Sequence, residues 1–166
     1  MPNKKCEELV KQEKYTELLT YCSERLDLGL PKEEYLFYQA VALTALKNFS
    51  KAENIFTNLF NKTKKYFYLI CRGLTRFLAG NFEGGKKDFA EAIYNDESYN
   101  DMIFVFRITS SYYDLEDAKE ALEKAMELNK KESLDELGKM FEGLSENVKI
   151  EDRLMFVRIM ELLKVI

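Results

Sequence analysis

Three short stretches of the sequence share one pattern: Asn48-Phe49-Ser50-Lys51-Ala52, Asn81-Phe82-Glu83-Gly84-Gly85 and Asp114-Leu115-Glu116-Asp117-Ala118. Each begins with Asn or Asp, continues with a large apolar residue and places a small residue three positions later. The interval of 33 residues continues downstream, through Phe56, Phe89 and Leu122 and then through Leu59, Ala92 and Ala125. A weaker copy, Lys14-Tyr15-Thr16-Glu17-Leu18, lies 34 residues before the first. The chain is therefore built from an internal repeat.

Each unit of the repeat reads as two helices joined by a short turn. Asn or Asp at the turn caps the second helix, and Gly80 allows a left-handed residue there. The small residues let two helices approach closely. Ser98-x-x-Asp101 and Ser133-x-x-Glu136 are typical of helix N-caps. We expect ten helices, at about 4–12, 15–27, 33–46, 49–61, 66–79, 82–94, 99–112, 115–129, 134–144 and 151–165.

The composition agrees with an all-α fold and excludes several kinds of chemistry. The 166 residues are 46% hydrophobic and include only two prolines, which excludes a disordered chain and a turn-rich β fold. Histidine is absent from the sequence, so Ser-His or Cys-His catalytic pairs and His-ligated zinc or haem are excluded. The net charge of −4 argues against a nucleic-acid partner. We expect no catalytic residues, no metal and no cofactor.

The helical unit resembles the tetratricopeptide repeat, most strongly over residues 33–130. Gly73 falls at the family's close-packing glycine, and Ala40 falls at the equivalent place one unit earlier. The aromatic residues of the family's first helix are replaced, for example by Leu36 and Leu43. The resemblance implies a single domain, 1–166, that is an α-solenoid of stacked antiparallel helix pairs. Its units are about 1–31, 32–64, 65–97 and 98–131, followed by a pair of capping helices at 132–166.

The resemblance also implies a function, that of a non-enzymatic scaffold binding a partner peptide or helix on its concave surface. The first helix of each unit lines that surface in the family. The matching register directs toward it Phe37, Val41, Phe67, Ile70, Leu74, Phe77, Ile103 and Arg107. A subgroup of the family grips carboxylate tails with cationic residues. The corresponding positions here hold Asn3, Glu7, Tyr38, Phe67, Cys71 and Phe104, so we do not expect a carboxylate-tail receptor.

Arg72 and Arg76 form a polar stripe on an otherwise apolar helix, Tyr66 to Leu78. Two guanidinium groups one turn apart favour an acidic peptide or a carboxylate, which makes both residues candidates for partner binding. The alternative is that they reach solvent or pair with acidic residues of the next unit.

The C-terminal stretch Leu154–Ile166 is unusually apolar, with ten apolar residues out of 13. A helix of this length is too short to span a bilayer, so we expect no transmembrane segment. Three arrangements are open: it folds into the concave groove, it pairs with another copy or a partner, or it is a final core helix. One alternative function is therefore a self-assembling structural protein, through this helix or the groove. Another, a variant of the scaffold, is a dedicated chaperone that shields an apolar segment of a secreted or membrane client.

The three cysteines, Cys6, Cys22 and Cys71, are odd in number and lack C-x-x-C spacing. This argues against a disulfide framework or a zinc site and favours small buried hydrophobes in a reducing cytosol. The polar N-terminus does not resemble a secretory signal. We therefore expect a cytoplasmic protein.

Overall fold

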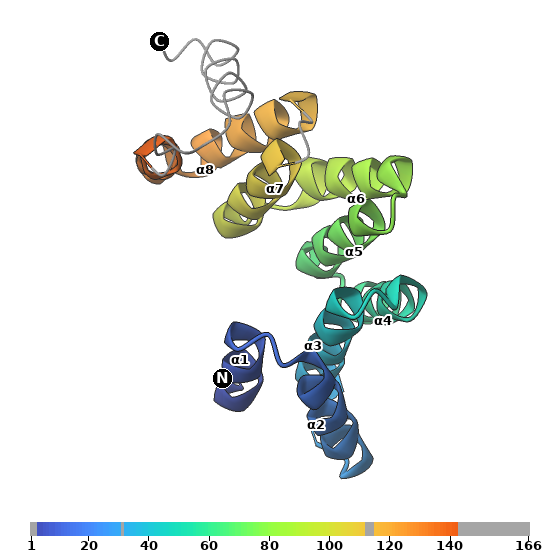
Figure 1. Ribbon diagram of the computed structural model, residues 1–166. Helices are drawn as coiled ribbons and strands as arrows, with labels where there is room; N and C mark the ends of the chain where they lie inside the picture. Colours follow the sequence, from blue (N-terminus) through green and yellow to red (C-terminus); the bar gives the residue numbers. More distant parts are fainter. Residues whose placement is uncertain (1–2, 31, 112–114, 143–166) are drawn as a thin grey trace. The chain divides into compact units, whose positions relative to one another are not determined.

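A computed structural model describes residues 3–30, 32–111 and 115–142 of the chain. These residues form eight α-helices, and no strand occurs among them (Figure 1). The all-α fold predicted from the sequence is therefore confirmed. The helices are α1 (Lys4–Lys11), α2 (Tyr15–Asp27), α3 (Lys32–Ala45), α4 (Phe49–Thr63), α5 (Tyr66–Leu78), α6 (Phe82–Asn95), α7 (Tyr99–Ser111) and α8 (Leu115–Glu142).

The internal repeat appears directly in the helix boundaries and in the core. The second helix of each pair begins at Tyr15, Phe49, Phe82 or Leu115, which reproduces the sequence intervals. Successive helices pack on one another, α2 on α3, α3 on α4, α4 on α5, and α7 on α8. The repeated positions are buried throughout, as shown by Ala52, Gly85, Ala118, Phe56, Phe89, Leu122, Leu59, Ala92 and Ala125. The repeat is therefore a repeat of core contacts.

The turn inside the first three pairs also repeats, at the level of the backbone. Glu13, Lys47 and Gly80 each adopt a left-handed conformation, with φ of 56°, 61° and 83°. The next residue then donates its N–H to the carbonyl oxygen five positions earlier, which closes the preceding helix. These bonds are Lys14 to Leu9 at 2.9 Å, Asn48 to Leu43 at 2.8 Å and Asn81 to Arg76 at 2.8 Å. The left-handed conformation predicted for Gly80 is confirmed.

Helix α8 consists of two helical segments that meet at a kink at Asn129 (φ −156°, ψ 88°). The first segment ends there, as predicted for the helix at 115–129, whereas the second begins directly after the kink and not at residue 134. The Asn129 side chain accepts a hydrogen bond from the Glu132 N–H at 3.3 Å, and the Ser133 hydroxyl donates back to the Asn129 carbonyl at 2.8 Å. The predicted Ser133 cap is therefore wrong, because Asn129 caps this part of the helix. The helix expected at 151–165 lies outside the described residues.

The Ser98 cap is confirmed, since its hydroxyl accepts the Asp101 N–H at 3.3 Å.

The chain divides into two compact units, Met1–Asp88 and Phe89–Ile166, with the boundary inside α6. In the first unit, α1 packs on α2 around a cluster that includes Cys6, Leu9, Leu18 and Cys22. In the second unit, α7 and α8 pack together, and Met102, Phe106 and Leu122 are fully buried there.

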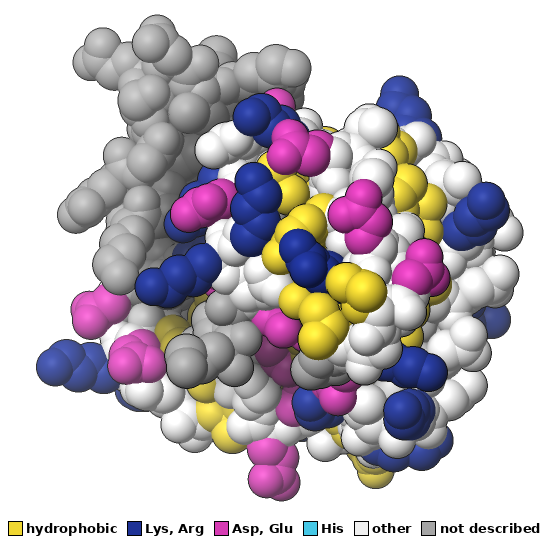
Figure 2. All heavy atoms as spheres, turned by 90° about the horizontal axis from the view of Figure 1, so that it is seen from below, with side chains coloured by type: hydrophobic (Ala, Val, Ile, Leu, Met, Phe, Trp, Pro, Cys, Tyr) yellow, Lys and Arg dark blue, Asp and Glu magenta, His cyan; other side chains and the backbone are white. Residues whose placement is uncertain are grey.

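Some large hydrophobic side chains are exposed, among them Leu28, Leu46, Leu78, Phe82 and Tyr94. On the face shown in Figure 2, hydrophobic side chains lie between Lys, Arg, Asp and Glu side chains. Among the described residues no helix combines the length and the apolar character needed to cross a membrane.

Candidate partner-binding site

Two parallel first helices, α3 and α5, are tied together at both ends. Near their N-terminal ends the Glu33 carboxylate accepts hydrogen bonds from Lys65 at 2.5 Å and from the Tyr68 hydroxyl at 2.8 Å. Near their C-terminal ends the hydroxyls of Thr44 and Thr75 lie 3.1 Å apart. Lys65 and Tyr68 lower the pKa of Glu33, which keeps its carboxylate charged. These ties hold the two helices side by side.

Between these ties, Phe37 of α3 and Phe67 of α5 face each other, with ring centroids 5.5 Å apart and planes at 46°. Both rings are only partly buried, and so are Val41 and Leu74 on the same two helices. We call these four residues the α3–α5 strip. They are the apolar residues among the predicted binding residues of α3 and α5 that are partly exposed.

The strip rests on buried aromatic rings. The Phe37 centroid lies 6.3 Å from that of buried Phe56 on α4 and 6.1 Å from that of buried Tyr68. Burial raises the pKa of Tyr68, and its bond to Glu33 raises the pKa further, so the phenol stays neutral. A partner would therefore meet a preorganised surface.

Three other predicted residues belong to the core. Ile70, Phe77 and Ile103 are 0%, 4% and 7% exposed. The Phe77 side chain packs against α6. Its ring lies edge-on to that of Phe82, with centroids 5.4 Å apart, and it covers Gly85. Ile103 is buried in the second unit, whereas Arg107 on the same helix is exposed.

The two predicted arginines are engaged inside the first unit. Arg72 makes a two-bond ion pair with Asp88 of α6, at 2.9 Å from Nε and 2.7 Å from Nη2, and its Nη1 donates to Thr57. Arg76 binds the same carboxylate through Nη1 at 2.9 Å and binds Glu53 of α4 through Nε at 2.8 Å. Asp88 is 2% exposed. The arginines therefore cross-link α4, α5 and α6.

This outcome agrees with the predicted pairing but differs in the source of the acids. The next unit was expected to supply them, whereas Asp88 comes from the same helix pair and Glu53 comes from the preceding one.

A second surface feature, which the sequence reasoning missed, is an open groove between α6 and α8 in the second unit. It is lined by Ala90, Ile93, Tyr94, Glu120, Glu123, Lys124 and Glu127. The Lys124 ammonium donates to the carbonyl oxygens of Ile93 and Tyr94 near the end of α6. The Lys124 ammonium is thus held at the C-terminal end of α6. The carboxylates of Glu120, Glu123 and Glu127 give the groove a negatively charged lining.

Two interacting carboxyl groups lie at the N-terminal end of α7: Asp101 is in its first turn, and Asp96 precedes the helix. Burial raises the pKa of Asp101 to about 7, and a hydrogen bond and repulsion from Asp96 raise it as well. The Asp96 carboxylate also accepts the Ser98 N–H at 3.0 Å. Asp101 therefore holds a proton at a pH where an ordinary aspartate is ionised.

Comparison with protein-family models, with curated proteins and with solved structures finds no match for this chain. Among the described residues, no group of three or more His, Cys, Asp or Glu side chains is placed to hold a metal ion.

Proposed function

We propose that this chain is a non-enzymatic interaction module of the tetratricopeptide kind, which binds an apolar segment of another protein on the α3–α5 strip. The observation that carries the proposal is the pair of partly exposed rings, Phe37 and Phe67, held 5.5 Å apart on two helices tied at both ends. Aromatic residues on a fixed surface bury much area with little loss of side-chain entropy, which is typical of binding surfaces.

The partner's chemistry follows from the strip itself. Its four members are apolar, and Arg72 and Arg76 are committed to Asp88 and Glu53. We therefore infer an apolar or amphipathic segment, helical or extended, in place of an acidic peptide. The absence of histidine from the sequence supports a binding role over a catalytic one. Free thiols at Cys6, Cys22 and Cys71 support a reducing compartment such as the cytoplasm.

The alternatives of self-assembly and of a dedicated chaperone remain proposals of lower rank. Self-assembly depends on the apolar stretch 154–166, which lies outside the described residues. A dedicated chaperone would use the same strip for the apolar segment of its client.

A selection from a peptide display library tests the proposed function. We expect the folded protein to select peptides with two or more large apolar residues, and Leu74→Gln or Phe67→Gln to weaken their binding at least about tenfold. Tyr94→Gln is the control for the loss of an aromatic residue outside the strip, because Tyr94 is 84% exposed and lines the α6–α8 groove. Unchanged binding by both strip variants, with helicity retained, would contradict the proposal.

A further inference from the structure

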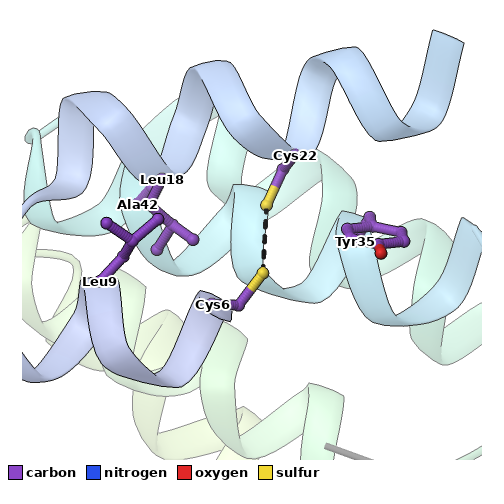
Figure 3. Packing of buried hydrophobic residues seen from close by; sticks show 6 residues of the cluster. All are labelled: Cys6, Leu9, Leu18, Cys22, Tyr35 and Ala42. Atoms are coloured by element: carbon purple, nitrogen blue, oxygen red, sulfur yellow. Dashed lines mark hydrogen bonds between the residues drawn. The ribbon is translucent and has the colours of Figure 1, made fainter. Parts of the chain in front are cut away.

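Two thiols that are distant in the sequence meet inside the first unit. The sulfur atoms of Cys6 on α1 and Cys22 on α2 lie 3.9 Å apart, and both side chains are fully buried. Their side chains point toward each other between the two helices (Figure 3). A disulfide needs the sulfurs at about 2.05 Å, so the two sulfur atoms would have to approach each other by about 2 Å.

The surroundings keep the two thiols protonated and slow to react while α1 is packed. Leu9, Leu18 and Ala42 belong to the same buried cluster (Figure 3). Burial raises the pKa of Cys22 to about 12 and also raises the pKa of Cys6. Since the thiolate is the reactive form, oxidation requires that the pair first become exposed.

Helix α1 is the element whose opening would expose them. It has eight residues and buries only two side chains, Cys6 and Leu9. Helices this short are marginal by themselves, so α1 depends on this small contact and on the bonds of Asn3. The Asn3 side chain accepts the Cys6 N–H at 3.2 Å and donates to the Tyr35 hydroxyl at 2.9 Å. Local release of α1 therefore requires less free energy than unfolding of the whole chain.

We propose that Cys6 and Cys22 form an oxidation site, at which a disulfide oxidant such as glutathione disulfide links α1 covalently to α2. One cysteine thiolate attacks glutathione disulfide and releases one glutathione thiolate, which leaves a mixed disulfide on the protein. The second cysteine thiolate attacks the protein sulfur of that mixed disulfide and releases the second glutathione. Two protein thiols are thus oxidised, one glutathione disulfide is reduced, and the two thiol protons pass to the released glutathione.

The disulfide would act as a latch, by which we mean a covalent link that keeps α1 packed on α2. In the reduced protein α1 opens and closes, whereas the disulfide holds it on α2 in its packed position. The inference does not depend on the proposed partner-binding strip. Cys71, which lies on α5, serves as an internal control because the chain has three cysteines and the other two face each other.

The test uses the full chain in glutathione buffers of increasing oxidising strength, quenched with acid and then alkylated under denaturing conditions. The reduced protein should take up three alkyl groups and the oxidised protein one, at Cys71, with a mass loss of about 2 Da before alkylation. Peptide mapping should find the Cys6–Cys22 link in the wild type and in Cys71→Ala. Cys6→Ala and Cys22→Ala should form no intramolecular disulfide.

Hydrogen exchange then tests the latch itself. Amides of α1 should exchange at least about tenfold more slowly in the oxidised protein, while those of α4 should be unchanged. Glutathione on Cys71 with Cys6 and Cys22 still reduced would overturn the oxidation site. A Cys6–Cys22 disulfide that leaves α1 exchange unchanged would overturn the latch.

Discussion

Asp88 receives Arg72 as a two-bond ion pair, with both carboxylate oxygens engaged and only 3% of the Asp88 side chain exposed. Arg76 shares the same carboxylate and joins it to Glu53. Two positive and two negative groups thus form one neutral network across α4, α5 and α6. Such networks are sensitive to the loss of one member, because the remaining charges stay buried without their partner.

Replacing Asp88 by Asn should therefore lower the free energy of unfolding by about 3 kcal/mol, since two arginines lose a shared counter-charge. The matched control is Glu17→Gln, because the Glu17–Lys5 pair is half-exposed at 3.7 Å and should contribute less than about 1 kcal/mol. Urea titrations of both variants measure the difference. Equal small losses would show that the network does not stabilise the first unit.

Adjacent glycines of α6 should differ in their tolerance of the same substitution. A Cβ at Gly85 would lie 2.2 Å from the Phe77 ring and 2.9 Å from the Gly73 carbonyl oxygen, so Gly85→Ala should destabilise by about 1–3 kcal/mol. The three atoms nearest to a Cβ at Gly84 belong to the exposed Asn81 side chain, at 2.6–2.9 Å, and this side chain would have to move and weaken its cap on the Gly84 N–H. Because alanine favours the helix and offsets this loss, Gly84→Ala should change stability by less than about 1 kcal/mol. Thermal melts compare the two. A stable Gly85→Ala variant would contradict the close packing of α5 on α6.

The repeated turn offers a swap experiment. Lys47 and Gly80 occupy equivalent left-handed positions, where a residue with a Cβ is strained. Lys47→Gly should raise the free energy of unfolding by about 0.5–1 kcal/mol, and Gly80→Lys should lower it by a similar amount. Denaturant titration of the two variants and of the double swap measures both effects. Changes of the same sign in both single variants would mean that the two turns are not equivalent.

Asp101 gives stability a specific dependence on pH. Its native pKa of about 7 lies above the ordinary value of 3.8, so the native state binds the proton more tightly than the unfolded state does. This contribution is complete at acidic pH and is lost as the pH rises through about 7. Asp101→Asn, which resembles the protonated form, should gain stability relative to the wild type as the pH rises from about 4 to about 7. A difference between the two proteins that is constant over this range would refute the assignment.

Much of the fold can be predicted from the sequence because the repeated residues are those at which neighbouring helices contact each other. Small residues at Ala52, Gly85 and Ala118 mark close approaches, and Asn or Asp precedes the second helix in three of the four pairs. The predicted cap is confirmed at Asn81, whose side chain accepts the Gly84 N–H at 3.0 Å, but Asn48 makes no side-chain capping bond. Both signals are local, so they predict helix starts without knowledge of the partner helix. The predicted Ser133 cap was wrong because Asn129, four residues earlier, is also a capping residue. Its side chain accepts the Glu132 N–H, so the helical segment already begins before Ser133.

The site was harder to predict because each helix meets neighbours on more than one side. Phe37 and Phe77 were both predicted to line the concave surface. The Phe77 ring is instead buried, because Gly85 has no side chain and leaves room for the ring against α6. The Cys6–Cys22 contact also depends on packing. The sequence did contain one indication of this contact. Cys22 stands 34 residues before Phe56, at a position of the repeat that holds a large residue in the other units. A small residue at this position leaves space for a second side chain, here that of Cys6.

The most direct test of partner binding by the α3–α5 strip is site-specific photo-cross-linking to a peptide selected on the folded protein. A photoreactive phenylalanine analogue is placed at Phe67, inside the strip, in one variant and at the exposed Tyr94, outside it, in another. We predict a cross-linked product from position 67 that excess unlabelled peptide abolishes, and none from position 94. Cross-linking from position 94 alone would contradict the assignment of partner binding to this strip.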